Sequence, residues 1–223
     1  YARKMSRLAE RRKAELADEA FELTTCQLAK STDSAALKAW LKGEGVTLPK
    51  ATRKLKDGTF RKSESVAKKA VGDMLKDPNV SDLVRSVLAN RIEASKATSL
   101  AKLKRIESMV GNDGRLRDAL QIYGAHTGRW ASYGLQIHNL RKDRRKGLGP
   151  EMTSHCVEAE DYDGLLAIED RPLDALSMVL RGVITAGPGH DLIGGDFSAI
   201  EARGLAWLAG QYDVLGVFAR WDE

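Results

Sequence analysis

The sequence of 223 residues is poor in several features that would define its class. Its only cysteines are Cys26 and Cys156, which excludes a disulfide scaffold and a four-cysteine zinc site and is typical of a reducing compartment. No apolar run approaches the roughly 18–20 residues of a membrane-spanning helix. The chain begins with Tyr1 instead of Met, and no apolar signal core follows. We therefore expect an intracellular segment of a longer protein, without a membrane partner.

Charge is unevenly distributed along the chain. Hydrophobic residues make up 43% and charged residues 30%, which indicates a folded protein with a net charge of +5. Residues 1–150 contain 32 basic and 17 acidic side chains, whereas residues 151–223 contain 4 basic and 14 acidic ones. A basic block of this size attracts polyanions, nucleic acid first, although many basic helical domains bind none.

The first half of the sequence predicts helices. They are expected over about residues 2–30, from Ser34 to near Gly43, from Ser63 to about Leu75, and as one long helix over 80–110. The basic stretch 46–58, which contains Pro49, predicts an exposed loop.

The pattern changes in the second half. An extended run is expected over 116–125, a basic mobile segment over 141–150, a helix over 174–184, and a short buried strand over 191–197. Two more helices are expected over 198–209 and 212–220. The fold class is therefore α+β, mostly helical, with a short antiparallel sheet.

Asp196 is placed where the expected strand meets the next helix. A carboxylate at such a position is held rigidly with one side open, which suits Mg²⁺. An ordinary helix N-cap is the alternative role for an isolated Asp.

The residues around Asp196 resemble a known motif. Asp196-Phe197-Ser198-Ala199-Ile200-Glu201-Ala202-Arg203 is similar to motif A of the family A, polymerase I-like DNA polymerases, usually D-Y-S-Q-I-E-x-R. Phe197 and Ala199 are the departures from that pattern.

Two further matches lie upstream, in the expected order. Thr127-Gly128-Arg129-Trp130-Ala131-Ser132 resembles the family's T-G-R-x-S segment. The residues from Gly134 onward resemble the following Gln-x-Gln-Asn-Leu-Pro-Arg run of phage members, with His138 for the second Gln and Arg141-Lys142 for Pro-Arg. The stretch 91–102 looks like the thumb helix that grips the duplex.

The resemblance implies a function and a role for each matching residue. The intact enzyme would be a nucleotidyltransferase that adds deoxynucleotides from triphosphates to a primer, directed by a template. Asp196 and the carbonyl of Phe197 would hold two Mg²⁺ ions, and Glu201 would exclude a ribose 2′-hydroxyl. Primer–template DNA would be contacted by Arg129, Gln136, His138, Asn139, Lys96, Ser99, Lys102 and Arg203. Several of these roles have a structural alternative. Glu201 would then be a surface residue of a helix, Arg203 would form a structural ion pair, and Lys96, Ser99 and Lys102 would lie on a solvated helix face.

The same resemblance predicts the domain organisation. Residues 1–114 would be a helical thumb and residues 115–223 a partial palm, without the fingers, so the fragment alone is expected to be inactive. Exposed edges of the palm sheet would favour self-association. The cytoplasm of a bacterial or phage-infected cell is the expected location.

The alternatives are a non-catalytic DNA-binding module, such as the relic of a truncated prophage gene, and a helical protein-interaction domain. His190-Asp191 is expected to be a loop dipeptide, because it precedes motif A.

Overall fold

The computed structural model describes residues 1–54, 58–141, 149–195 and 197–221. The chain forms two compact units, Tyr1–Val183 and Ile184–Glu223. The described residues form helices for the most part, together with two small antiparallel sheets, each of two strands. The expected fold class, a mostly helical α+β protein, is therefore confirmed. No helix among these residues has the length and apolar character needed to cross a membrane.

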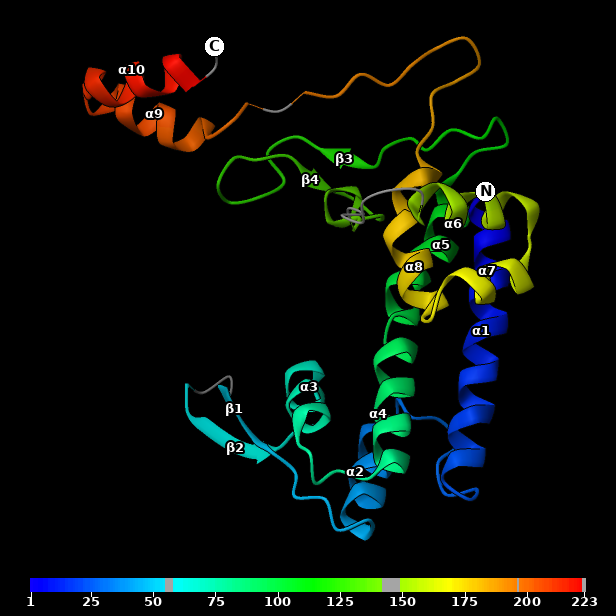
Figure 1. Ribbon diagram of the computed structural model, residues 1–223. Helices are drawn as coiled ribbons and strands as arrows, with labels where there is room; N and C mark the ends of the chain where they lie inside the picture. Colours follow the sequence, from blue (N-terminus) through cyan, green and yellow to red (C-terminus); the bar gives the residue numbers. More distant parts are fainter. Residues whose placement is uncertain (55–57, 142–148, 196, 222–223) are drawn as a thin grey trace. The chain divides into compact units, whose positions relative to one another are not determined.

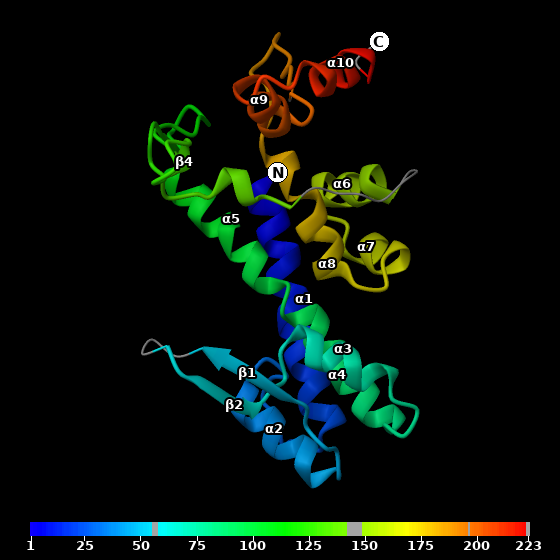
Figure 2. The same cartoon turned by 90° about the vertical axis from the view of Figure 1, so that its left-hand side faces the viewer.

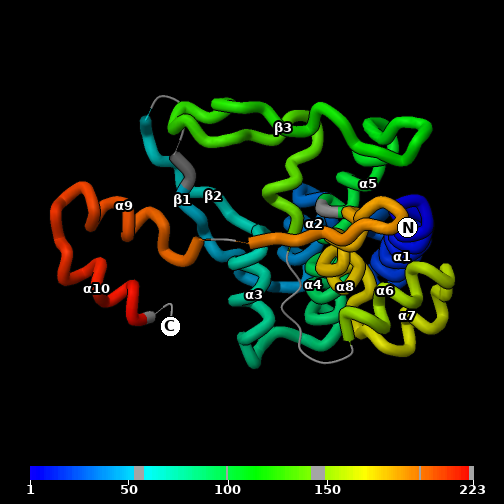
Figure 3. Tube along the Cα trace, turned by 90° about the horizontal axis from the view of Figure 1, so that it is seen from above, coloured from blue at the N-terminus to red at the C-terminus, as the bar shows by residue number. Residues whose placement is uncertain are grey.

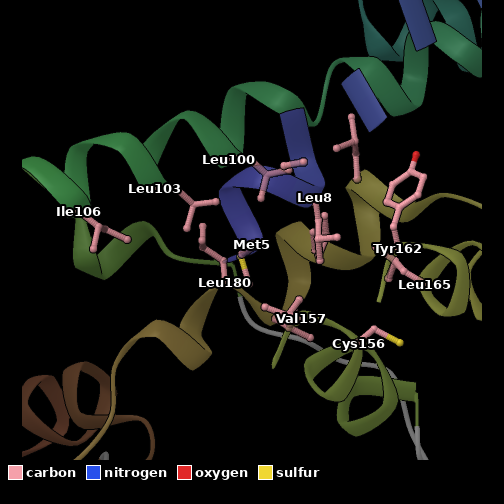
Figure 4. Close-up of a cluster of buried hydrophobic side chains, with 14 of the residues drawn as sticks. Met5, Leu8, Leu100, Leu103, Ile106, Cys156, Val157, Tyr162, Leu165 and Leu180 are labelled. Atoms are coloured by element: carbon pink, nitrogen blue, oxygen red, sulfur yellow. The ribbon is translucent and has the colours of Figure 1, made fainter. Parts of the chain in front are cut away.

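One hydrophobic core surrounds the N-terminal part of the long helix α1 (Ala2–Leu23). It is formed with α5 (Ala97–Met109), α6 (Gly149–Ala159), α7 (Tyr162–Ile168) and α8 (Pro172–Met178). Figure 3 shows α5, α6 and α8 around the N-terminal end of α1. Figure 4 draws side chains of this core, among them Met5, Leu8, Leu100, Leu103, Ile106, Val157, Leu165 and Leu180.

A second core is formed by helices that lie toward the C-terminal end of α1, whose ribbons Figures 1 and 2 show. It joins α2 (Ser34–Gly43), α3 (Lys68–Lys76) and α4 (Asp82–Ala94). The buried side chains of this core are Leu28, Leu37, Trp40, Leu41, Leu48, Val66, Val71, Met74, Val84, Val87 and Leu88. The helix expected from Ser34 to near Gly43 is confirmed, with Asp33 as its N-cap because the carboxylate accepts from two backbone N–H groups.

The interpretation of residues 46–58 as a loop is wrong. Strand β1 (Lys50–Lys54) pairs with β2 (Phe60–Glu64) in an antiparallel hairpin, with Lys50 opposite Glu64. Ser63 therefore belongs to a strand and does not cap the next helix, whose N-cap is Ala67. The hairpin escaped detection because neither strand alternates apolar and polar residues, and no side chain whose burial is described in them belongs to a core.

The long helix expected over 80–110 is two helices, α4 and α5, separated at Ser95 and Lys96. The Ser95 hydroxyl donates to the carbonyl of Ile92 at 2.7 Å, and the amide of Lys96 donates to the carbonyl of Glu93, three residues back. Such local bonds compete with the regular helical pattern and bend the chain. The break therefore lies between the helix of the second core and the helix of the first.

A buried ion-pair network joins α1, α4 and α8 near this break. The Arg12 guanidinium donates to both carboxylate oxygens of Glu93, at 3.1 and 3.0 Å, and to Glu19 at 2.6 Å. Glu93 also accepts from the backbone N–H of Leu173 at 3.2 Å. Burial opposes the charge of Arg12, but the hydrogen bonds and charges of Glu93 and Glu19 outweigh it and raise the pKa of Arg12. The network fixes the orientation of α1 against α4.

The rest of the first unit is less regular. Strands β3 (Leu120–Gln121) and β4 (Ala131–Ser132) pair antiparallel and are followed by the short helix η1 (Ile137–Asn139). The extended run expected over 116–125 is thus confirmed only for β3 and for Leu116, which forms an isolated antiparallel bridge with Val110. The helix expected over 174–184 corresponds to α8 and the 3₁₀ helix η2 (Val179–Val183). Residues 142–148 of the expected mobile segment lie outside the described residues.

The second unit contains α9 (Ile200–Leu208) and α10 (Tyr212–Trp221), in agreement with the two helices expected there. The buried strand expected over 191–197 is wrong. Residues 191–195 form no strand, Ile193 is 97% exposed and Phe197 is 79% exposed. A strand needs a neighbour for its backbone N–H and C=O groups, and no described segment pairs with this one.

The two cysteines differ in accessibility. Cys26 is exposed, whereas Cys156 is buried in the first core, where burial raises the pKa of its thiol. We expect a disulfide reagent such as DTNB to modify Cys26 at least about tenfold faster than Cys156, since the thiolate is the reacting form and needs access. Stopped-flow absorbance with Cys26→Ser as the control separates the two thiols. Equal rates in the folded chain would contradict this expectation.

Candidate nucleic-acid interface

The T-G-R segment forms the loop between β3 and β4. The amide of Ala125 donates to the carbonyl of Arg129 at 3.3 Å, and the amide of Gly128 donates to that of Ala125 at 2.9 Å. Gly128 has φ +78°, a conformation that favours glycine, and a Cβ there would lie 3.0 Å from the ring of Tyr123. This turn places Arg129 in an exposed position at the end of the hairpin.

Short polar contacts connect the hairpin to η1. The Oγ of Ser132 lies 2.6 Å from Nδ1 of His138. The side-chain amide of Asn139 donates to Oε1 of Gln136 at 2.7 Å. Three of the predicted DNA-binding residues, Gln136, His138 and Asn139, are therefore neighbours on one exposed turn.

The turn at η1 packs against the first of the two hydrophobic cores, the one around the N-terminal part of α1. Leu135 and Leu140, which flank η1, are buried in that core. Lys102 of α5 donates through Nζ to the backbone carbonyl of Asn139 at 3.0 Å. Lys102 thus joins the three predicted residues of η1, and its ammonium adds a positive charge at the turn.

Lys96 belongs to a different cluster. Its Nζ lies 2.6 Å from Asp174, and its side chain is only 16% exposed. Arg141 donates to the same carboxylate oxygen of Asp174 at 2.5 Å and to the hydroxyl of Ser177 at 2.9 Å. Burial opposes the charge of Asp174, but the hydrogen bonds from Lys96 and Arg141 outweigh it and hold the pKa of that carboxyl below its usual range. Ser99 lies within α5.

The candidate catalytic residues lie in the second unit. Asp196 lies outside the described residues, and Phe197, whose carbonyl is the second predicted metal ligand, is exposed just before α9. Glu201 is exposed in the first turn of α9. The Nε of Arg203 donates to the carbonyl of Ser198 at 2.7 Å, and its guanidinium lies over the ring of Phe218 at 4.7 Å.

A metal site can be tested only in the described part of the chain. There, no three His, Cys, Asp or Glu side chains gather where they could hold a metal ion. The described residues by themselves therefore do not fit a metal centre, and the predicted pair of Mg²⁺ ions still depends on Asp196 and the motif around it.

Two residues of the site were missed by sequence reasoning. Ser132 contacts His138, and Asp174 holds Lys96 and Arg141. The only signal for the first was its place at the end of the segment 127–132, one residue beyond the serine position of T-G-R-x-S, which is Ala131 in this chain. Asp174 carried no signal, because its partners lie far away in the sequence.

The chain is similar to a known protein over almost its whole length. Across 210 residues, 94% of this chain, it is 32% identical to a protein of Bacillus phage SP02 that is named DNA polymerase. The matched region is 29% of the length of that protein. No family model matches the chain, and no solved structure gives a significant match.

Proposed function

We propose that this chain is a segment of a family A DNA polymerase of the phage type, and that its first unit binds primer–template DNA. The similarity to the phage SP02 protein supports the proposal most strongly, because it covers 94% of the chain. The T-G-R loop, the turn at η1 and the residues of motif A are the parts of this chain that would serve that activity.

The arrangement of donors in the first unit supports the DNA-binding part of the proposal. Arg129 and the side-chain amides of Gln136 and Asn139 are exposed hydrogen-bond donors, and Lys102 is a half-buried one, whereas duplex DNA offers phosphate oxygens and minor-groove acceptors. The basic excess of residues 1–150 adds long-range attraction for the phosphate backbone.

The catalytic part of the proposal rests on the motif around Asp196. In the intact polymerase we propose Asp196 and the carbonyl of Phe197 as ligands of Mg²⁺, which would supply charge stabilisation for phosphoryl transfer when bound. Glu201 is proposed to exclude a ribose 2′-hydroxyl, and Arg203 to support the segment through the carbonyl of Ser198. Deoxynucleoside triphosphates would be substrates of the intact enzyme only.

Binding to a fluorescent primer–template duplex tests the first part. We expect the 223-residue chain to bind it with an affinity that falls steeply with salt, by about 0.9 log units per log unit of salt for each phosphate contacted. The same chain is expected to give no primer extension with Mg²⁺ and deoxynucleotides. Absence of salt-sensitive binding would favour a protein-interaction domain instead, and template-dependent extension would overturn the expected inactivity.

Matched substitutions distinguish a DNA contact from a structural ion pair. We expect Arg129→Ala to weaken duplex binding and to reduce the salt slope by about one contact, since a phosphate-binding Arg releases a counterion. Lys96→Ala should change the slope less, because the Lys96 side chain is only 16% exposed and is therefore less accessible to a phosphate. Fluorescence anisotropy over a range of salt concentrations measures both. Equal slopes for Arg129→Ala and the unchanged chain would remove Arg129 from the interface.

A further inference from the structure

We propose that Ser132 is a positioning residue for DNA binding, which holds His138 in the tautomer that carries its proton on Nε2. The inference rests on the proposed function, because it assigns a role within the same exposed turn. It concerns the position at which this chain has His where the resembled phage run has Gln.

Ser132 is fixed by the hairpin. It lies in β4 opposite Leu120, and the amide of the next residue, Tyr133, donates to the carbonyl of Ala119 at 2.9 Å. Gly134, with φ +71°, then turns the chain back toward η1. The hydroxyl of Ser132 is therefore held close to the point that the chain reaches again at His138, six residues later.

His138 is fixed by the core beneath it. Its helix η1 lies between the buried side chains of Leu135 and Leu140, and Ile137 packs against the same core. The amide of Asn139 donates to the carbonyl of Gln136 at 3.1 Å, and that of Leu140 donates to Ile137 at 3.1 Å. With both ends held, the 2.6 Å separation of Ser132 Oγ and His138 Nδ1 is a property of the fold.

This contact determines which ring nitrogen carries the proton. A neutral imidazole has one N–H, and the bond made by one nitrogen fixes the state of the other. When the Ser132 hydroxyl donates to Nδ1, Nε2 carries the N–H and becomes a donor. Nε2 lies on the other side of the ring, and no described residue is its partner.

The surroundings favour a donor at this point. Asn139 uses Oε1 of Gln136 as its acceptor, so the amide N–H groups of Gln136 take no part in that bond, and Lys102 brings an ammonium to the same turn. Every base pair presents acceptors in the minor groove, purine N3 and pyrimidine O2. An Nε2–H matches these acceptors, whereas the opposite tautomer would place one acceptor against another.

The experiment reads the tautomer and DNA binding separately. ¹⁵N spectra of the 223-residue chain at about pH 8 report which ring nitrogen carries the proton, and His138→Gln identifies the signals of His138. We expect the Nε2–H form in the unchanged chain and a shift toward a mixture in Ser132→Ala. Primer–template affinity should fall about threefold to tenfold in Ser132→Ala, the effect of one hydrogen bond.

Two further variants complete the design. Ser132→Thr keeps the hydroxyl and should retain both the tautomer and the affinity, whereas Ser86→Ala, an exposed serine on α4, should change neither. An Nδ1–H tautomer in the unchanged chain, or His138 signals that Ser132→Ala leaves unaltered, would overturn the positioning role. If the unchanged chain shows the Nε2–H form but binds no duplex, the proposed function fails and the DNA role of Ser132 fails with it.

Discussion

Asp196→Ala in a full-length polymerase that carries this segment is expected to lower template-directed synthesis by about a thousandfold or more. A carboxylate that holds the metal stabilises charge which develops only in the transition state, and a loss of about 4 kcal/mol there corresponds to that factor. Primer–template affinity should stay within about twofold, because under the proposed function the phosphate contacts to the duplex are made elsewhere. Primer extension measures the loss of synthesis, and fluorescence anisotropy measures the primer–template affinity of the same preparation.

Asp191→Ala is the matched control for this substitution. Asp191 lies five residues earlier, in the exposed stretch before α9, and it is expected to have no part in the chemistry. Synthesis retained by Asp196→Ala would remove Asp196 from its proposed metal-binding role. A comparable loss in Asp191→Ala would indicate that the whole segment, and not the one carboxylate, is sensitive to change.

The second large effect is expected at Glu93. Its carboxylate is 5% exposed and accepts both Arg12 and the backbone N–H of Leu173. Glu93→Ala would leave the Arg12 charge, itself only 13% exposed, without its main partner, and removal of one member of a buried pair costs about 3–5 kcal/mol. Urea unfolding followed by circular dichroism at 222 nm measures the change in the free energy of unfolding.

Two more variants show whether burial explains that effect. Glu93→Gln retains the volume and one acceptor, so its unfolding midpoint should lie between those of Glu93→Ala and the unchanged chain. Glu10→Ala breaks an ion pair with Lys104 that is exposed on both sides, and its midpoint should barely move. If Glu10→Ala and Glu93→Ala lowered the free energy of unfolding by similar amounts, the buried network would contribute no more to stability than an exposed ion pair.

Most helices were predictable because they depend on local signals. Residues 34–43 repeat apolar side chains at helical spacing and end at glycine, and the structure has the helix there. The split of 80–110 was not predictable from spacing, since neither Gly nor Pro marks Ser95–Lys96. The break coincides with the contacts of Glu93 and Lys96 to distant residues, and those contacts exist only in the folded chain.

The errors in the strands have opposite causes. The β1–β2 hairpin has no apolar face to reveal it, although Asp57-Gly58 in the sequence is a typical hairpin signal. Residues 191–197 do have the apolar residues of a strand, but no described segment pairs with them. Apolar composition therefore predicted a strand at residues 191–197, which have no described pairing partner. It missed the β1–β2 hairpin, whose strands are defined by their backbone pairing and not by apolar side chains.

The candidate site was predictable to the extent that motifs identify residues. Gln136, His138 and Asn139 were recognised from their order in the sequence, and the structure places them on one turn with Lys102. Motifs did not predict which polar groups contact one another. The bond from Ser132 to His138 and the carboxylate of Asp174 beneath Lys96 follow from the packing of separate elements.

The β1–β2 hairpin also makes the chain accessible to engineering. Because none of its side chains whose burial is described belongs to either core, a change of length there removes no core contact. Related chains are expected to vary in length at this point more than along α4 or α5. A dye or an affinity tag attached to this ribbon would report on the molecule while leaving both cores intact.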